Sequence, residues 1–176
     1  MIDFDGVYMN STVYVNGHLV GNRPYGFSSF EYDITKYLNS RGENVIAVKV
    51  DNSDQPNCRW YSGCGIYRHV YLVKTQPVHV SHWGTYVSPV IDTNGNAVFH
   101  IATMLQNDAG RKVSVKVQNT IIDNQGKNVA QNTVAAMLTD TVTTTQQIVL
   151  ASPELWSVER PYIYKVKTDV IAGGKI

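Results

Sequence analysis

The sequence has little that would bind a metal, cross-link the chain or carry charge of one sign. Its 176 residues include two cysteines, Cys58 and Cys64, whose spacing fits neither a C-x-x-C pair nor a four-ligand zinc set. The 15 basic and 14 acidic residues are interspersed and leave a net charge of +1. We therefore expect no nucleic-acid partner, because such proteins gather Lys and Arg on one face.

Membrane and cofactor signals are also missing. No stretch approaches the roughly 20 apolar residues that span a bilayer, and residues 1–5 lack the basic start and apolar run of a signal peptide. A soluble chain without a membrane partner is expected. Residues 63–68 begin like a dinucleotide fingerprint, but Arg68 takes the place of the last glycine and a strand follows where a helix is required. With the five histidines scattered, we predict neither a cofactor nor a metal site.

Strand-like alternation fills most of the first 75 residues. Residues 11–15 lead into Asn16-Gly17, a strong signal for a two-residue hairpin, and residues 18–21 form the returning arm. Further strands are expected at residues 30–34, 44–50 and 66–72, with one helical turn at residues 35–38.

The rhythm changes after Thr75-Gln76-Pro77, which predicts two domains, at residues 1–75 and 76–176. Turn residues such as Asn94-Gly95 separate the later strands. Strands are expected at residues 78–87, 97–106, 113–122, 129–134, 143–150 and 162–171. About six strands at this spacing indicate an immunoglobulin-like sandwich, which normally has seven. Both ends of the chain look cut.

Six segments form an ordered series of motifs, residues 4–7, 13–21, 30–35, 42–48, 60–70 and 155–164. This series resembles one enzyme family. Residues 4–72 resemble the second half of the sugar-binding jelly roll that opens family-two glycoside hydrolases, the β-galactosidase, β-mannosidase and β-glucuronidase group. Residues 78–171 resemble the immunoglobulin-like linker domain of the same family, and the β-galactosidase branch is the nearest in character. The resemblance implies an all-β chain, in which an incomplete jelly-roll, galactose-binding-like β-sandwich precedes an immunoglobulin-like β-sandwich.

The resemblance also implies that catalysis belongs elsewhere. Retaining glycosidases use two carboxyl groups about 5–5.5 Å apart. The resemblance implies that these groups lie on a TIM barrel that follows the two domains. The acid/base of the family lies in an Asn-Glu pair, and no Asn-Glu occurs here. We therefore predict no catalytic residue and no hydrolysis by this chain alone. Its four glutamates are Glu31, Glu43, Glu154 and Glu159, the last expected to cap or to form a salt bridge.

One segment, the loop of residues 51–65, is a candidate for function, because loops of this length in compact domains are usually functional. In the family the corresponding loop reaches toward the sugar pocket of the barrel. Carboxylate, amide and guanidinium groups bind sugar hydroxyls, and an aromatic face stacks on the ring. The predicted contacts to substrate in the intact parent enzyme are Asp54, Asn57, Arg59 and Trp60. Alternatively, the loop only packs the jelly roll against the barrel, with Trp60 as a wedge.

Several questions stay open on the sequence alone. The leading hypothesis is a non-catalytic accessory portion of a β-galactosidase-like enzyme, whose carbohydrate partner is a β-galactoside. The alternative hypotheses are a free-standing carbohydrate-binding module and an adhesin-type interaction domain.

Cys58 and Cys64 either form a disulfide across their turn or remain separate thiols. Trp83 and Trp156 are expected in a core or between domains. Because an incomplete jelly roll leaves unpaired strand edges, we also expect the chain to self-associate.

Overall fold

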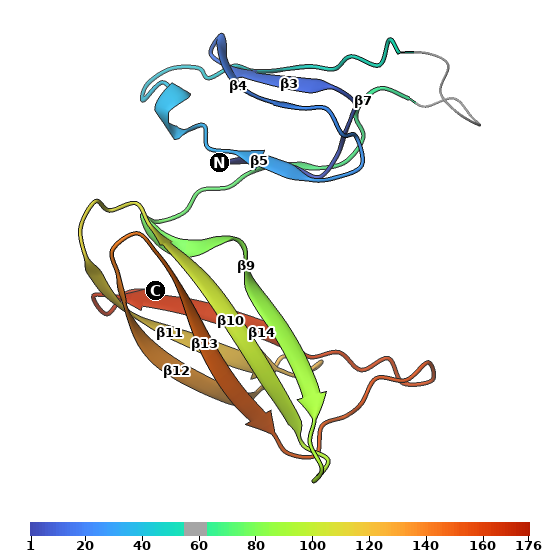
Figure 1. The fold of residues 1–176 in the computed structure, drawn as a ribbon, viewed down its shortest axis with the longest axis vertical. Helices are drawn as coiled ribbons and strands as arrows, with labels where there is room; N and C mark the ends of the chain where they lie inside the picture. The colour runs from blue at the N-terminus through green and yellow to red at the C-terminus, as the bar shows by residue number, and fades with distance from the viewer. Residues whose placement is uncertain (55–62) are drawn as a thin grey trace. The chain divides into compact units, whose positions relative to one another are not determined.

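The computed structural model describes residues 1–54 and 63–176, and these divide into two compact units, Met1–Lys74 and Thr75–Ile176. Both units are built from antiparallel strands, and one 3-10 turn is the only helical element among the described residues (Figure 1). The expected all-β class is therefore confirmed.

The first unit packs two three-stranded sheets around a small apolar core. One sheet has the order β5-β1-β8 and the other β4-β3-β6, while β2 and β7 form a separate two-stranded ladder. The buried core residues are Ile2, Phe4, Val7, Val13, Val15, Phe30 and Ile34. The strands are β1 (Ile2–Phe4), β2 (Val7–Tyr8), β3 (Ser11–Val15), β4 (His18–Arg23), β5 (Phe30–Tyr32), β6 (Ile46–Lys49), β7 (Gly65–Ile66) and β8 (Val70–Leu72).

The Asn16-Gly17 hairpin joins β3 to β4 as its sequence predicts. Both residues have positive φ, 49° and 81°, and Val15 stands opposite His18. Positive φ at both turn positions defines a type I′ turn, whose twist matches that of the strands it joins. The helical turn expected at residues 35–38 is present as the 3-10 turn η1 (Thr35–Tyr37).

One strand prediction was wrong, since residues 66–72 form two strands and not one. β7 pairs with β2, whereas β8 pairs with β1, and the chain bends between them at residues 67–69. The physical reason is that β1 and β2 are themselves separated by a bend. Their partner follows this bend, with backbone hydrogen bonds from Asp5 N to His69 O at 3.0 Å and from Tyr67 N to Gly6 O at 3.3 Å.

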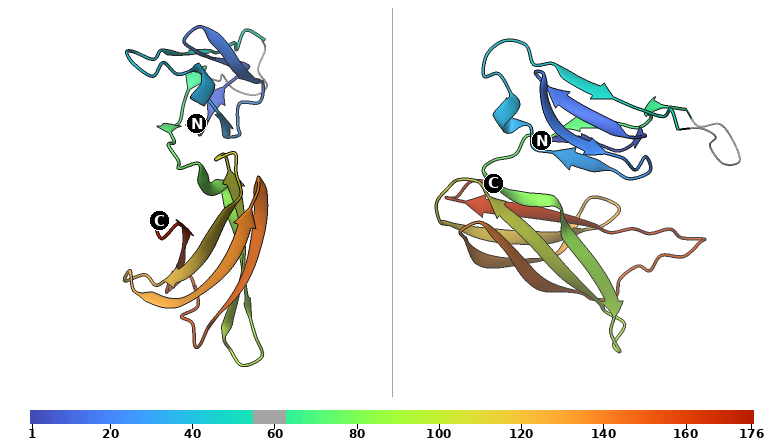
Figure 2. Two further views of the ribbon diagram at one scale, coloured as in Figure 1. Left: turned by 90° about the vertical axis from the view of Figure 1, so that its left-hand side faces the viewer. Right: turned by 45° about the horizontal axis from the view of Figure 1, so that its top comes forward.

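The second unit is a sandwich of two three-stranded sheets, β13-β10-β9 and β12-β11-β14. The right-hand view of Figure 2 shows the green and yellow strands β9 and β10 in one layer and the red strand β14 in the other. All six strands predicted by the turn spacing are present, although the last begins three residues later than expected. They are β9 (Val78–Ile91), β10 (Ala97–Asn107), β11 (Val113–Ile122), β12 (Asn128–Leu138), β13 (Thr141–Leu150) and β14 (Lys165–Ala172).

The interior of this sandwich holds two apolar clusters. One is centred on Phe99 and Ile101, and the other on Leu105 and Val117. Buried polar side chains also lie inside the sandwich, namely Thr103, Asn119, Thr144 and Gln146. Asn119 bonds to both sheets, because its Nδ2 donates to Thr103 Oγ1 at 3.4 Å and its Oδ1 accepts from Thr168 Oγ1 at 2.6 Å.

Candidate functional site

The loop between β6 and β7 is described at both of its ends, at residues 51–54 and 63–64. Of the four predicted sugar contacts, Asp54 lies in the described part and is exposed. Asn57, Arg59 and Trp60 lie outside the described residues, as does Cys58, so its pairing with the exposed Cys64 stays a question.

The first end of the loop is fastened to the segment after β2. Asp51 N donates to Met9 O at 3.1 Å, and Asn10 Nδ2 donates to Asp51 O at 3.2 Å. The Asp51 carboxylate turns back on the chain and accepts from both the hydroxyl and the backbone N–H of Ser53, at 2.6 and 3.1 Å. These two bonds hold the pKa of Asp51 below its usual value. Asp51 therefore shapes the loop, and the exposed carboxylate at this end belongs to Asp54.

The second end is fastened by the β2–β7 ladder and by Tyr67. Gly65 pairs with Tyr8 and has φ of 122°, a backbone conformation that favours glycine. The hydroxyl of Tyr67 donates to Gly26 O at 2.7 Å, which links the loop end to the turn between β4 and β5. Both ends of the loop are thus held by hydrogen bonds to residues 7–10, and the second end is also held to the turn between β4 and β5.

An aromatic cluster that the sequence did not single out lies on the turn reached by Tyr67. Tyr25 and Phe27 meet edge to face with ring centroids 5.8 Å apart, and Phe27 also contacts Tyr8 at 5.1 Å. Both turn residues are well exposed, 59% for Tyr25 and 68% for Phe27. Gly26 between them is required by space, since a Cβ there would lie 2.4 Å from the ring of Tyr8. The only signal in the sequence is the Pro24-Tyr25-Gly26-Phe27 turn, which does not disclose exposure.

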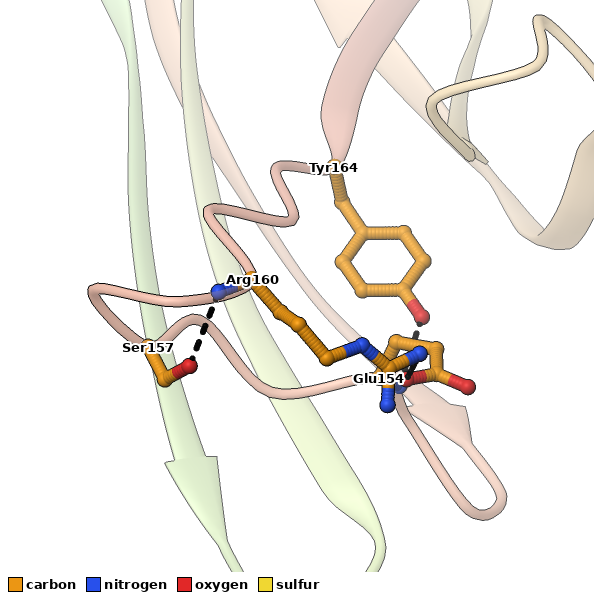
Figure 3. Close-up of polar contacts among 4 residues, drawn as sticks. All are labelled: Glu154, Ser157, Arg160 and Tyr164. Atoms are coloured by element: carbon orange, nitrogen blue, oxygen red, sulfur yellow. Dashed lines mark hydrogen bonds and ion pairs between the residues drawn. The ribbon is translucent and has the colours of Figure 1, made fainter.

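The segment between β13 and β14, residues 151–164, includes residues 155–164, on which the predicted resemblance of the second unit rests, and it is held by its own polar contacts (Figure 3). Arg160 forms an ion pair with Glu154 at 3.2 Å, and its backbone N–H donates to Ser157 Oγ at 3.0 Å. The hydroxyl of Tyr164 accepts from Glu154 N at 2.9 Å. The salt bridge expected of Glu159 is thus made by Glu154.

This segment borders an apolar groove within the second unit. The groove has a volume of about 740 Å³ and runs between the segment and the inward faces of β9 and β10. Its lining includes Val87, Ile91, Phe99, Leu155, Trp156 and Ile163. Trp156 is 61% exposed and Trp83 is 76% exposed, so neither occupies the core of its unit.

The described residues offer no group of three or more His, Cys, Asp or Glu side chains placed to hold a metal ion. No helix in the same part of the chain is long and apolar enough to cross a bilayer.

Comparison with known families accounts for both units. Residues 1–77 match the sugar binding domain of glycosyl hydrolases family 2, and residues 78–176 match a second domain described as glycosyl hydrolases family 2. The two matches cover the whole sequence, and the chain belongs to glycosyl hydrolase family 2.

Individual relatives include enzymes of two specificities. A β-galactosidase of Bacteroides ovatus is 47% identical over 172 residues, which cover 97% of this chain and 20% of the relative. A β-glucuronidase of Formosa agariphila is 31% identical over 202 residues, covering 99% of this chain and 20% of the relative. The crystal structure of a family 2 member from Bacteroides cellulosilyticus superposes with a TM-score of 0.93 at 36% identity, over 99% of this chain and 24% of that one. The chain therefore spans about a fifth of the length of the curated relatives it matches.

Proposed function

We propose that this chain is a non-catalytic accessory portion of a retaining β-glycosidase that acts on β-galactosides. The observation that carries the proposal is the loop of residues 51–65, fastened at both ends within the domain that matches the family's sugar binding domain. Hydrogen bonds hold the described residues at each end of the loop, and groups that are ordered before binding lose less entropy when they bind a ligand.

The described chemistry around the loop supports contact with a sugar. The exposed carboxylate of Asp54 accepts hydrogen bonds from hydroxyl groups, and charge-assisted bonds of this kind are stronger than neutral ones. Tyr25 and Phe27 present exposed rings on the turn that Tyr67 ties to the loop end. Aromatic faces suit the apolar face of a pyranose ring. In this proposal Asp54 orients the substrate, together with Asn57, Arg59 and Trp60.

The bracing role is assigned to residues 151–164. Leu155, Trp156, Val158 and Ile163 are all exposed on this segment, beside the apolar groove. Clustered exposed apolar side chains mark interaction surfaces, and aromatic residues are enriched at the centres of such surfaces. We assign this surface to contact with the catalytic part of the parent enzyme.

The test of the loop uses the full-length enzyme that the proposal implies. Replacing Asp54 with Asn is expected to raise KM for a chromogenic β-galactoside by about 10-fold or more with a smaller change in kcat, because the contact helps bind the ground state. Asp140→Asn, an exposed carboxylate in the second unit, is the matched control. Unchanged kinetics in Asp54→Asn would remove the loop from the site, and hydrolysis by the 176-residue chain alone would refute the accessory role.

A further inference from the structure

The outer face of the sheet β13-β10-β9 carries a hollow that the loop proposal does not use. It has a volume of about 410 Å³ and is lined by Tyr86, His100, Ile101, Ala102, Thr145, Gln146 and Gln147. This volume lies within the roughly 300–1,000 Å³ typical of sites for small molecules. The hollow lies wholly within the second unit, which the family comparison does not describe as sugar-binding.

Strand register explains why the sheet is hollowed at this point. Ala102 on the central strand stands directly between Tyr86 on β9 and Thr145 on β13. Directly opposed residues on neighbouring strands place their Cβ atoms about 4.5–5.5 Å apart. A methyl group between two larger side chains therefore leaves open space above it. Ile101 and Gln146 line the base, and their own side chains are buried in the sandwich.

The walls combine one aromatic face with uncharged hydrogen-bonding groups. Tyr86 is 70% exposed. Two residues along each strand from the Ala102–Thr145 pair, on the same face, His100 stands opposite Gln147. Their side chains form a hydrogen bond of 3.2 Å. The amide of Gln147 and the hydroxyl of Thr145 can each donate and accept, as can a neutral imidazole. Hydroxyl groups of a sugar require both kinds of partner.

The lining also restricts the charge of the ligand. No Lys, Arg, Asp or Glu belongs to the hollow, so an anionic ligand would lose hydration without gaining an ion pair. An uncharged pyranose, with an apolar ring face and a rim of hydroxyls, fits this lining better than a uronic acid or a phosphorylated sugar.

We infer that this hollow is an auxiliary binding site for an uncharged saccharide, separate from the loop of residues 51–65. The choice of carbohydrate as ligand rests on the proposed function, whereas the position and the charge selectivity rest on the sheet itself. Tyr86 stacks on the sugar ring, and Thr145, His100 and Gln147 bind its hydroxyls.

The site is complete within the 176-residue chain, so the chain itself is the material for the test. Titration with lactose, followed by amide chemical shifts and calorimetry, is expected to perturb residues 86, 100–102 and 145–147 with an affinity of about 1 mM. Tyr86→Ala should weaken binding about tenfold, the size expected of one lost aromatic contact. Tyr86→Phe keeps the ring and should stay within about twofold of the parent affinity. Tyr71→Ala removes an exposed tyrosine from the first unit and should leave binding unchanged.

Three results would overturn the inference. The first is an absence of shifts at the hollow, including the case in which all shifts fall on residues 51–67, which would leave the loop proposal standing. The second is binding of sodium glucuronate as tight as that of lactose. The third is a change in the amide chemical shifts at the hollow when the protein concentration is raised in the absence of sugar. Such a change would show that a second copy of the chain covers this face. A failure of Asp54→Asn to alter hydrolysis would refute the loop proposal and leave the hollow untouched.

Discussion

Gly84 shows at the level of one residue how the backbone of β9 limits the sequence. Residues 81–84 lie opposite Met104 alone, because β9 pairs Thr85 with Thr103 and Val80 with Leu105. This bulge brings the backbone close to Gly84, where a Cβ would lie 2.7 Å from both Met104 O and Ser81 O. Backbone atoms held by a sheet cannot move aside as a flexible side chain can.

Replacing Gly84 with Ala should therefore destabilise the second unit. Overpacking of this kind costs about 1–3 kcal/mol, which urea unfolding followed by circular dichroism can measure. The control is Gly63→Ala, since a Cβ at Gly63 meets nothing within 4 Å. Equal stability of the two variants would show that the bulge relaxes without cost.

Asp33 gives a prediction about pH. Its Oδ1 accepts from the hydroxyl and the backbone N–H of Thr35, at 2.6 and 2.9 Å, and these bonds lower the pKa of Asp33. A carboxyl group whose pKa is lowered by folding contributes stability above its unfolded pKa, and this contribution is lost as pH falls through the folded value. The contribution of Asp33 should therefore be complete above about pH 5 and decline below about pH 4.

Asp33→Asn should make the first unit less stable at pH 7 and reduce the dependence of its stability on pH below 4. Thermal unfolding between pH 3 and pH 7 provides the measurement. Glu43→Gln, an exposed carboxylate without a side-chain partner among the described contacts, serves as the control. Parallel pH profiles for the Asp33 variant and the unmodified chain would contradict a stabilising role for the hydrogen bonds between Asp33 and Thr35.

The candidate site shows which properties of a residue a sequence discloses. Asp51 and Asp54 have the same chemistry in the sequence, but Asp51 bonds to Ser53 whereas Asp54 is exposed. Tyr25 and Phe27 could not be distinguished from core aromatics, because exposure depends on what packs against them. The different contacts of Asp51 and Asp54, and the exposure of Tyr25 and Phe27, were therefore not predictable from residue type.

At the level of elements, local signals were reliable where short-range sterics decide the structure. Asn16-Gly17 fixed its hairpin because the turn geometry depends on two residues. The break between β7 and β8 could not be seen in residues 66–72, because it is imposed by their partners, β2 and β1, about 60 residues earlier in the chain. The alternation of apolar and polar residues within one strand does not show which distant strand it pairs with, so this part of the fold could not be predicted.

The Asn119 bridge supports a prediction at the same scale. Asn119 on β11 joins Thr103 on β10 to Thr168 on β14, and it is fully buried. Asn119→Leu leaves the two hydroxyl groups without this partner, which should cost about 1–3 kcal/mol of unfolding free energy. Removing the unpaired hydroxyl as well should recover part of that loss, since replacing both partners by apolar groups is less costly than orphaning one.

A double-mutant cycle in urea, with Asn119→Leu, Thr168→Val and the double variant, measures this coupling. The double variant should lose less stability than the sum of the single changes by about 0.5 kcal/mol or more. Strict additivity would show that the bridge contributes no net energy between the strands.

For the whole molecule, the two units differ in the number of apolar clusters that they bury. The sandwich of the second unit buries two clusters between its sheets, whereas the first unit has one cluster and a short edge strand with apolar side chains in solvent. Along this strand, β8, every residue is exposed, and Leu72 reaches 73%. An edge strand that offers both free backbone groups and apolar side chains is a template for pairing with another chain.

We therefore expect the 176-residue chain to self-associate through β8. Its weight-average mass in sedimentation and light scattering should rise with concentration, and Leu72→Lys should suppress that rise, because a charge on an edge strand opposes pairing. Leu38→Lys places the same charge on an exposed leucine outside any strand and should leave association unchanged. A monomer of constant mass at every concentration would contradict the prediction, and equal suppression by both variants would point to net charge as the cause and exclude the edge of β8.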